Sequence, residues 1–304
     1  MLKFGRRKLM QWAGGSALGS ALFGGFLARR AWAQFVPFVG MALSPGGTGL
    51  WKLDQAGRIT SLGTAPQLDD ASIIPCIRPS PYVAMAAWPA GTVAGEGVVA
   101  LTLDGQFHAF GSFTLKGGLL SALERTSPLS GKRLPYAAFA AMPDGSGAWA
   151  IDMMGRLSTF GNAPTDFGDG TVNPCYTPSP YVGLVPTPEG DGLYALTQNG
   201  YIRTFGSATQ LGDGAIIPCI EPVPFVALAI TLDGDGLWAL DLLGRVRTIG
   251  TAAPFGDGSV VPCYHPSPYV AMVSTPSGEG LYALSKSSQL RTFGDALDFS
   301  APLP

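Results

Sequence analysis

Three arginines recur at one place in a repeated motif of this chain. The motif reads apolar-Arg-Thr-Phe/Ile-Gly, with Arg203, Arg247 and Arg291 at its second position, and His108 takes that position in another copy. Guanidinium groups at regular intervals could bind anionic groups, such as carboxylates of a glycan or a peptide. Alternatively, they form salt bridges or remain solvated while they hold one repeat against the next, and we favour this second interpretation.

Four cysteines occupy another repeated position, and each of them follows a proline: Cys76, Cys175, Cys219 and Cys263. An even number of cysteines in an exported chain suggests disulfides. However, a disulfide requires Cα atoms within about 7 Å, and equivalent points on neighbouring units of a ring come that close only near its axis. We therefore favour buried free thiols, while disulfides and a metal or cofactor site stay open as alternatives.

Other side chains with catalytic chemistry are sparse. The chain has two histidines, His108 and His265, so few groups could act as a general base near neutral pH. Gly-Asp-Gly occurs around Asp169, Asp213 and Asp257, but an aspartate between glycines is typical of a turn. We therefore predict no catalytic residues, no metal site and no cofactor, and whether the chain is an enzyme stays open.

These residues belong to six internal repeats, which begin at Phe38, Tyr82, Tyr136, Tyr181, Phe225 and Tyr269. The repeats share aromatic-Val-Ala-Met, then Thr-Pro-x-Gly-x-Gly-Leu-Trp/Tyr-Ala-Leu, then the arginine motif, and finally Pro-Cys-Tyr-x-Pro-Ser-Pro. Most repeats are about 44 residues long. This length is typical of propeller blades with four strands each.

The pattern inside one repeat predicts its strands. In the fourth repeat, β-rich runs cover residues 181–185, 192–197 and 201–205, with Asn199-Gly200 as a hairpin signal and a looser fourth strand around residues 215–219. The 42 glycines and 26 prolines also suit many short strands joined by tight turns. The predicted fold class is all-β, a six-bladed β-propeller of four-stranded repeats.

The ends of the chain predict how the ring closes. The last repeat has no Pro-Cys segment, whereas Gln34-Phe35-Val36-Pro37 precedes the first repeat where later repeats carry segments such as His265-Pro266-Ser267-Pro268. We expect the N-terminal segment to complete the last blade, which leaves no unpaired blade edge at the junction.

The repeats resemble those of secreted bacterial propeller repeat proteins, which read like Gly-Tyr-Trp-Leu-Val-Ala-x-Asp-Gly-Gly-Val-Phe-x-Phe-Gly-Asp-Ala. The matching stretches include residues 192–196 with 200–206, and residues 280–284 with 290–294. The resemblance implies an exported propeller. It implies no particular activity, because the family shares none.

The first strand of each repeat is expected to line the central channel. Its third position is small in all repeats (Gly40, Ala84, Ala138, Gly183, Ala227 and Ala271), and its fourth is apolar (Met41, Met85, Phe139, Leu184, Leu228 and Met272). A strand with two apolar faces is buried on both sides. We therefore predict a narrow, apolar channel.

The second repeat is longer than the others, around residues 88–96 and again after Gly111, where Lys132 and Arg133 follow. A loop that distinguishes one unit of a ring is suited to binding, so Lys132 and Arg133 are candidate binding residues. The alternative is a neutral insertion at a tolerant loop tip.

The N-terminal residues predict export. Arg6 and Arg7 precede a glycine-interrupted apolar stretch over residues 12–28, and Ala31-Trp32-Ala33 matches a cleavage site. We predict a twin-arginine signal peptide over residues 1–33, cleaved after Ala33, and a periplasmic or extracellular propeller over residues 34–304. The alternative is an uncleaved anchor, but this stretch is shorter than the ~20 residues of a membrane span, and no later stretch predicts a span.

The net charge of the mature chain limits which classes of partner it could bind. Cleavage would remove six of the 19 basic residues and none of the 21 acidic ones, which leaves 13 against 21 and a formal charge of −8. Nucleic acid is excluded, because its phosphates require clustered basic residues. We expect a monomeric, non-catalytic binding or scaffold protein that engages a protein or polysaccharide through its loops. The alternative is a periplasmic hydrolase or lyase, or a cofactor-carrying redox protein, on the same scaffold.

Overall fold

The computed structural model of the chain describes residues 36–68, 81–88, 97–111, 135–167, 179–211, 223–255 and 268–299. All of them belong to one unit, Val36–Pro304. The predicted signal peptide, the four cysteines, Lys132, Arg133 and the predicted fourth strands lie outside these residues. No helix in the described parts is long and apolar enough to cross a membrane.

The described residues form six antiparallel sheets of three strands each. Each sheet consists of strands that follow one another in the sequence, and we call it a blade. The strands are β1 (Phe38–Leu43), β2 (Gly49–Asp54), β3 (Ile59–Gly63), β4 (Tyr82–Trp88), β5 (Gly97–Thr102), β6 (Phe107–Gly111), β7 (Tyr136–Ala141), β8 (Gly147–Asp152), β9 (Leu157–Gly161), β10 (Tyr181–Pro186), β11 (Gly192–Thr197), β12 (Ile202–Gly206), β13 (Phe225–Ile230), β14 (Gly236–Asp241), β15 (Val246–Gly250), β16 (Tyr269–Ser274), β17 (Gly280–Ser285) and β18 (Leu290–Gly294).

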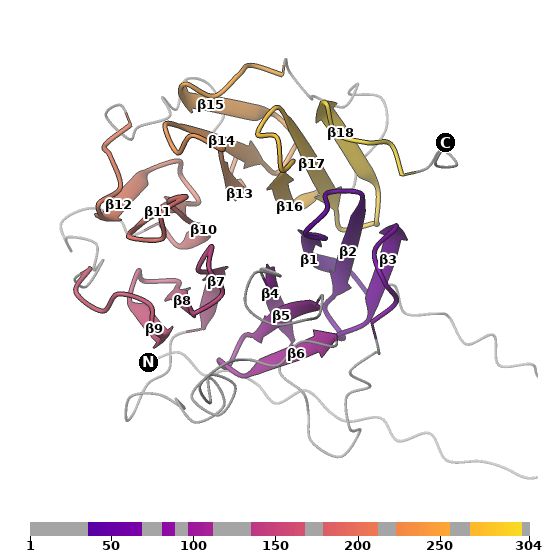
Figure 1. The fold of residues 1–304 in the computed structure, drawn as a ribbon, viewed down its shortest axis with the longest axis horizontal. Coiled ribbons are helices and arrows are strands. Elements are labelled where there is room, and N and C mark those ends of the chain that lie inside the picture. The colour runs from indigo at the N-terminus through magenta and orange to yellow at the C-terminus, as the bar shows by residue number, and fades with distance from the viewer. Residues whose placement is uncertain are drawn as a thin grey trace, which may run out of the picture. The chain divides into compact units, whose positions relative to one another are not determined.

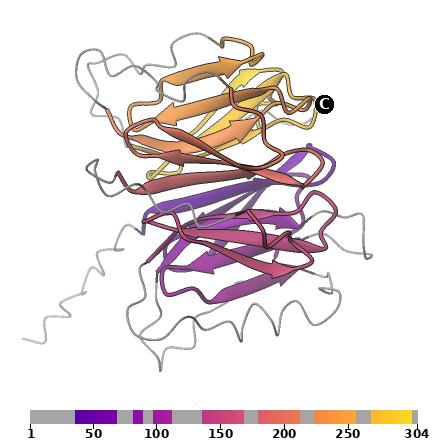
Figure 2. The same ribbon diagram turned by 90° about the vertical axis from the view of Figure 1, so that its left-hand side faces the viewer.

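The blades stand in a ring around a central opening (Figure 1), with the first strand of each blade innermost. Each first strand contacts the first strand of the next blade, and β16 contacts β1. A side view shows the sheets packed face to face around this ring (Figure 2). The predicted all-β, six-bladed propeller is therefore confirmed, with three strands of each blade described.

Burial explains why these strands form. The second strand of every blade is buried along its whole length, because a neighbouring blade covers each of its faces. The apolar side chains form six clusters, and each cluster joins two neighbouring blades. One of them joins the last blade to the first, with Tyr282 and Leu284 packed near Met41, Leu43 and Leu50.

Backbone hydrogen bonds tie each blade to the one before it. Every blade begins with a proline followed by an aromatic residue, and the aromatic N–H donates to a carbonyl in the turn between the second and third strands of the preceding blade. At the closure of the ring, Phe38 N–H donates to the Lys286 carbonyl at 3.1 Å. The other five bonds run from Tyr82 to Gln55, Tyr136 to Leu103, Tyr181 to Met153, Phe225 to Gln198 and Tyr269 to Leu242.

The proline before each aromatic residue completes this connection. Its carbonyl accepts a hydrogen bond from the turn residue of its own blade, as in Gln55 N–H to the Pro37 carbonyl at 2.8 Å. The same peptide group thus bonds two blades at once, and a ring of such bonds surrounds one end of the propeller. We call this end the turn face, and the opposite end, with the hairpins between first and second strands, the hairpin face.

The blades alternate in sequence and in structure. The first, third and fifth blades bury Trp51, Trp149 and Trp238, each of which donates its indole N–H to a carbonyl fifteen residues later. Their turns begin with an aspartate that accepts two backbone N–H groups, as Asp241 does from Leu243 and Arg245. The turns of the second, fourth and sixth blades begin with Thr102, Thr197 and Ser285, whose hydroxyls accept one backbone N–H each.

The third strand of the fourth blade begins at Ile202, one residue later than predicted. The cause is the turn before it, since Thr197 N–H donates to the Tyr201 carbonyl and the Thr197 hydroxyl accepts from Tyr201 N–H. Tyr201 therefore closes the turn.

Gly244 stands where the turn of the fifth blade meets the aromatic residue of the next blade, and its position requires glycine. Gly244 has φ +91°, and a Cβ there would lie 2.4 Å from Cε2 of Tyr269. We predict that Gly244→Ala destabilises the fold by about 2–4 kcal/mol, because a left-handed alanine is strained and the added carbon overpacks the blade junction. Urea unfolding of the purified protein measures this change.

The matched control is Gly46→Ala on the hairpin face. A Cβ at Gly46 meets nothing closer than the Thr48 hydroxyl at 3.7 Å, so its stability should stay within about 0.5 kcal/mol. Equal losses in both variants would show that the turn glycine has no special role.

Candidate functional site

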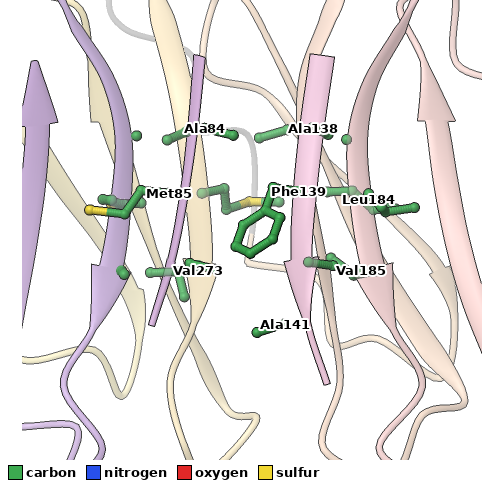
Figure 3. A pocket seen from close by; sticks show the side chains of 18 of the residues that line it. Ala84, Met85, Ala138, Phe139, Ala141, Leu184, Val185 and Val273 are labelled. Atoms are coloured by element: carbon green, nitrogen blue, oxygen red, sulfur yellow. The ribbon is translucent and has the colours of Figure 1, made fainter. Parts of the chain in front are cut away.

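The central channel is lined by the first strands of all blades. It holds a cavity of about 360 Å³, and every residue that lines it is apolar or glycine. Figure 3 shows the ring of Phe139 pointing into this space among Met85, Leu184 and Val273. The channel therefore offers apolar contact and no titratable group.

The small third position has a specific neighbour. A Cβ at Gly40 would lie 3.2 Å from Cβ of Met85, and a Cβ at Gly183 would lie 3.0 Å from Cβ of Leu228. A β-bulge in each first strand, as between Phe38 and Gly40, precedes this contact. The small residue thus makes room for the fourth-position side chain of the next blade.

No group of three or more His, Cys, Asp or Glu side chains in the described residues is placed to hold a metal ion. The candidate residues Arg203, Arg291 and His108 instead contact the first aromatic residue of their own blades. Arg203 donates to the Tyr181 hydroxyl and Arg291 to the Tyr269 hydroxyl.

The equivalent positions in other blades behave in the same way. His108 meets Tyr82 edge to face at 5.5 Å between ring centroids, and the Ser158 hydroxyl lies 3.0 Å from the Tyr136 hydroxyl. The structure therefore distributes these residues over separate blades and does not bring them into one anion site. These contacts lie within single blades, whereas the interpretation favoured from the sequence was that the arginines hold one repeat against the next.

Burial changes the acidity of these tyrosines. It raises the pKa of Tyr82 to about 12. Burial also raises the pKa of Tyr181 and of Tyr269, although the neighbouring arginines oppose the shift. These phenols therefore stay protonated at neutral pH, and those of Tyr181 and Tyr269 accept hydrogen bonds as neutral groups.

The junction between the last and the first blade carries a residue that the sequence reasoning missed. Lys52 lies in the buried second strand and is only 6% exposed. The other five blades have alanine there: Ala100, Ala150, Ala195, Ala239 and Ala283. This difference between repeats was the available signal.

Two side chains contact the Lys52 ammonium. Its Nζ donates to the Ser288 hydroxyl at 2.7 Å and lies 5.2 Å from the centroid of the Phe38 ring. Ser288 has φ +73°, where the turns of the other five blades have glycine. Burial lowers the pKa of Lys52. The charge is thus held by a hydroxyl and an aromatic face.

A cavity of about 510 Å³ opens beside Lys52 and Ser288. Its other walls come from β3, from β18 and from the segment after β18. They are Leu62, Leu290, Arg291, Thr292, Asp298 and Phe299. We call this space the junction cavity.

The turn face carries exposed apolar side chains. Five of the seven exposed large hydrophobic residues in the described parts lie in the turns between second and third strands: Leu103, Met153, Met154, Tyr201 and Leu243. The hairpin face has Leu232, which is 65% exposed. Among the described residues, exposed apolar side chains are therefore more numerous on the turn face than on the hairpin face.

No family model and no curated protein matches this chain. A solved structure, the β-propeller domain of Cps50 (Swd1) from Myceliophteria thermophila, superposes with a TM-score of 0.50 over 84% of this chain and 82% of that chain, at 13% identity. This similarity supports the propeller fold and, at such identity, nothing more specific.

Two arginines at equivalent positions provide a direct test of their role. Arg203 faces Tyr181, whereas Arg247 lies in a blade that begins with Phe225 and has no phenol to accept a hydrogen bond. We predict that Arg203→Ala lowers the free energy of unfolding by about 0.5–1.5 kcal/mol. Arg247→Ala should change it by at most about 0.5 kcal/mol. Urea unfolding of both variants is the measurement, and a larger loss for Arg247→Ala would contradict the assignment.

Proposed function

We propose that this protein is an exported, non-catalytic propeller that binds a partner through its turn face. The observation that carries the proposal is that exposed Met, Leu and Tyr side chains occur in the turns of four successive blades on that face. Apolar groups at exposed turn tips cost solvation free energy unless a partner covers them. Methionine and tyrosine are also enriched in protein interfaces, so we favour a protein partner over a polysaccharide on this face.

The channel supports a role in binding over one in catalysis. Its lining consists of apolar side chains and glycines, which cannot transfer protons or act as nucleophiles. A propeller with such a centre still provides a rigid ring on which loops are fixed at set distances.

The turn-face hypothesis is tested with a double variant, Met153→Ser with Leu243→Ser. Both side chains are exposed, so the fold should persist, while the loss of apolar contact area should weaken partner binding about tenfold or more. The measurement is chemical cross-linking of the mature protein in envelope fractions, followed by mass spectrometry of the linked partner.

Leu232→Ser on the hairpin face is the matched control, because Leu232 is exposed and lies at the other end of the ring. A partner that is lost in the double variant and retained in the control supports the proposal. Equal cross-linking in all three proteins, or no specific partner, would overturn it.

The paired Arg6 and Arg7 and the resemblance to secreted propeller repeats support the proposed export. We predict that Arg6→Lys with Arg7→Lys blocks export and leaves the precursor in the cytoplasm. Cell fractionation and N-terminal sequencing measure this, with Gln34 expected as the first mature residue. Arg29→Lys with Arg30→Lys, near the cleavage site, is the control that should still be exported. Normal export of the first variant would contradict the twin-arginine assignment.

A further inference from the structure

We propose that the junction cavity is a binding site for the carboxylate of an acidic sugar. This site is separate from the turn face. It rests on the proposed function only in that both proposals describe a binding protein. The residues that carry the proposal are Lys52, Ser288 and the other residues that line the cavity between the last and first blades.

Packing alone does not require a lysine at this position. Five blades place alanine in the equivalent buried site of the second strand. The first blade instead buries an ammonium group, and burial of a charge is costly unless a partner compensates for it. A benefit other than folding therefore explains the lysine.

The contacts seen in the structure only partly compensate for the burial of the Lys52 charge. One of the three ammonium N–H groups reaches the Ser288 hydroxyl, and the Phe38 ring supplies a weak second contact. The contacts seen for Nζ are thus one hydroxyl and one aromatic ring, which leave two of its N–H groups for other acceptors. Lys52 can therefore still donate to an incoming anion.

Ser288 marks the same place independently. A non-glycine residue at positive φ is strained, and such strain persists where a local function over-determines it. The side chain responsible for this strain is the one that accepts from Lys52. Lys52 and Ser288 thus both differ from the residue that the other repeats have, and the two side chains meet in the wall of the junction cavity.

The remaining lining indicates the class of ligand. A carboxylate forms a short, charge-assisted hydrogen bond with an ammonium group. The Thr292 side chain can bind a sugar hydroxyl, and Leu62 and Leu290 provide apolar surface for a pyranose face. The cavity volume of about 510 Å³ lies within the usual range for small-molecule sites. A hexuronic acid has a carboxylate, hydroxyls and a ring face, and could therefore meet the ammonium, the polar side chains and the apolar surface together.

Other small ligands fit less well. A neutral hexose leaves the buried ammonium without a counter-charge. Phosphate has no ring that could cover the apolar surface of Leu62 and Leu290, so it gains less contact in this cavity than a sugar acid. The expected order of affinity is therefore glucuronate, then phosphate and glucose.

The test compares the wild-type protein with Lys52→Met and with Lys286→Met, which removes an exposed lysine of the neighbouring turn. Calorimetric titration with glucuronate, glucose and phosphate gives the affinities. We expect glucuronate to bind the wild type and Lys286→Met equally. Lys52→Met should bind it about tenfold to a hundredfold more weakly, because a charge-assisted hydrogen bond is lost.

Stability in the absence of ligand separates this proposal from a structural role of Lys52. Replacement of an uncompensated buried charge by methionine should leave the unfolding midpoint unchanged or raise it. A lower midpoint with unchanged glucuronate binding would overturn the proposal. So would absence of glucuronate binding to the wild type, or equal affinity for phosphate, which indicates a general anion site.

The turn-face variant serves as the cross-check. Met153→Ser with Leu243→Ser leaves the junction cavity intact, so it should bind glucuronate as the wild type does. Unchanged cross-linking in this variant would overturn the turn-face proposal alone, whereas absence of glucuronate binding to the wild type would overturn the junction-cavity proposal alone.

Discussion

A blade of this propeller cannot bury its own middle strand, and this constraint governs the rest of the structure. The middle strands are buried on both faces, so each needs a neighbour on each side, and only a closed arrangement supplies one for every blade. The peptide group between proline and the aromatic residue then aligns the neighbours, because it bonds the turn of its own blade and that of the preceding blade. Ring closure is therefore part of the folding free energy of every blade.

Much of the fold could be predicted from the sequence, because six repeats show the same pattern of aromatic, apolar and turn residues. The starts of the repeats coincide with the starts of the first strands, from Phe38 to Tyr269, since the Pro-aromatic pair performs the same bonding in each blade. The apolar channel was also predictable from the small third and apolar fourth positions. What the pattern did not reveal is why the small residue is needed, which is the contact of Gly40 with Met85 in the next blade.

The candidate sites were less predictable, and the reason is physical. A repeated residue such as Arg203 draws attention because it recurs, yet Arg203 and Arg291 each contact the tyrosine that opens their own blade. A lysine occurs at the position of Lys52 in one blade alone. Its hydrogen-bond partner, Ser288, is far away in the sequence and becomes adjacent only when the ring closes. Sites that break the symmetry are formed by tertiary structure, so an average over repeats conceals them.

The alternation of the blades has a consequence for the origin of the ring. Blades with tryptophan and an aspartate-led turn alternate with blades that have a hydroxyl-led turn, so two successive blades form the smallest unit that contains both kinds of junction. In the described residues, the ring thus repeats approximately every two blades. Fusion of three such units into one polypeptide would then free single positions to diverge, as Lys52 and Ser288 have done where the ring closes.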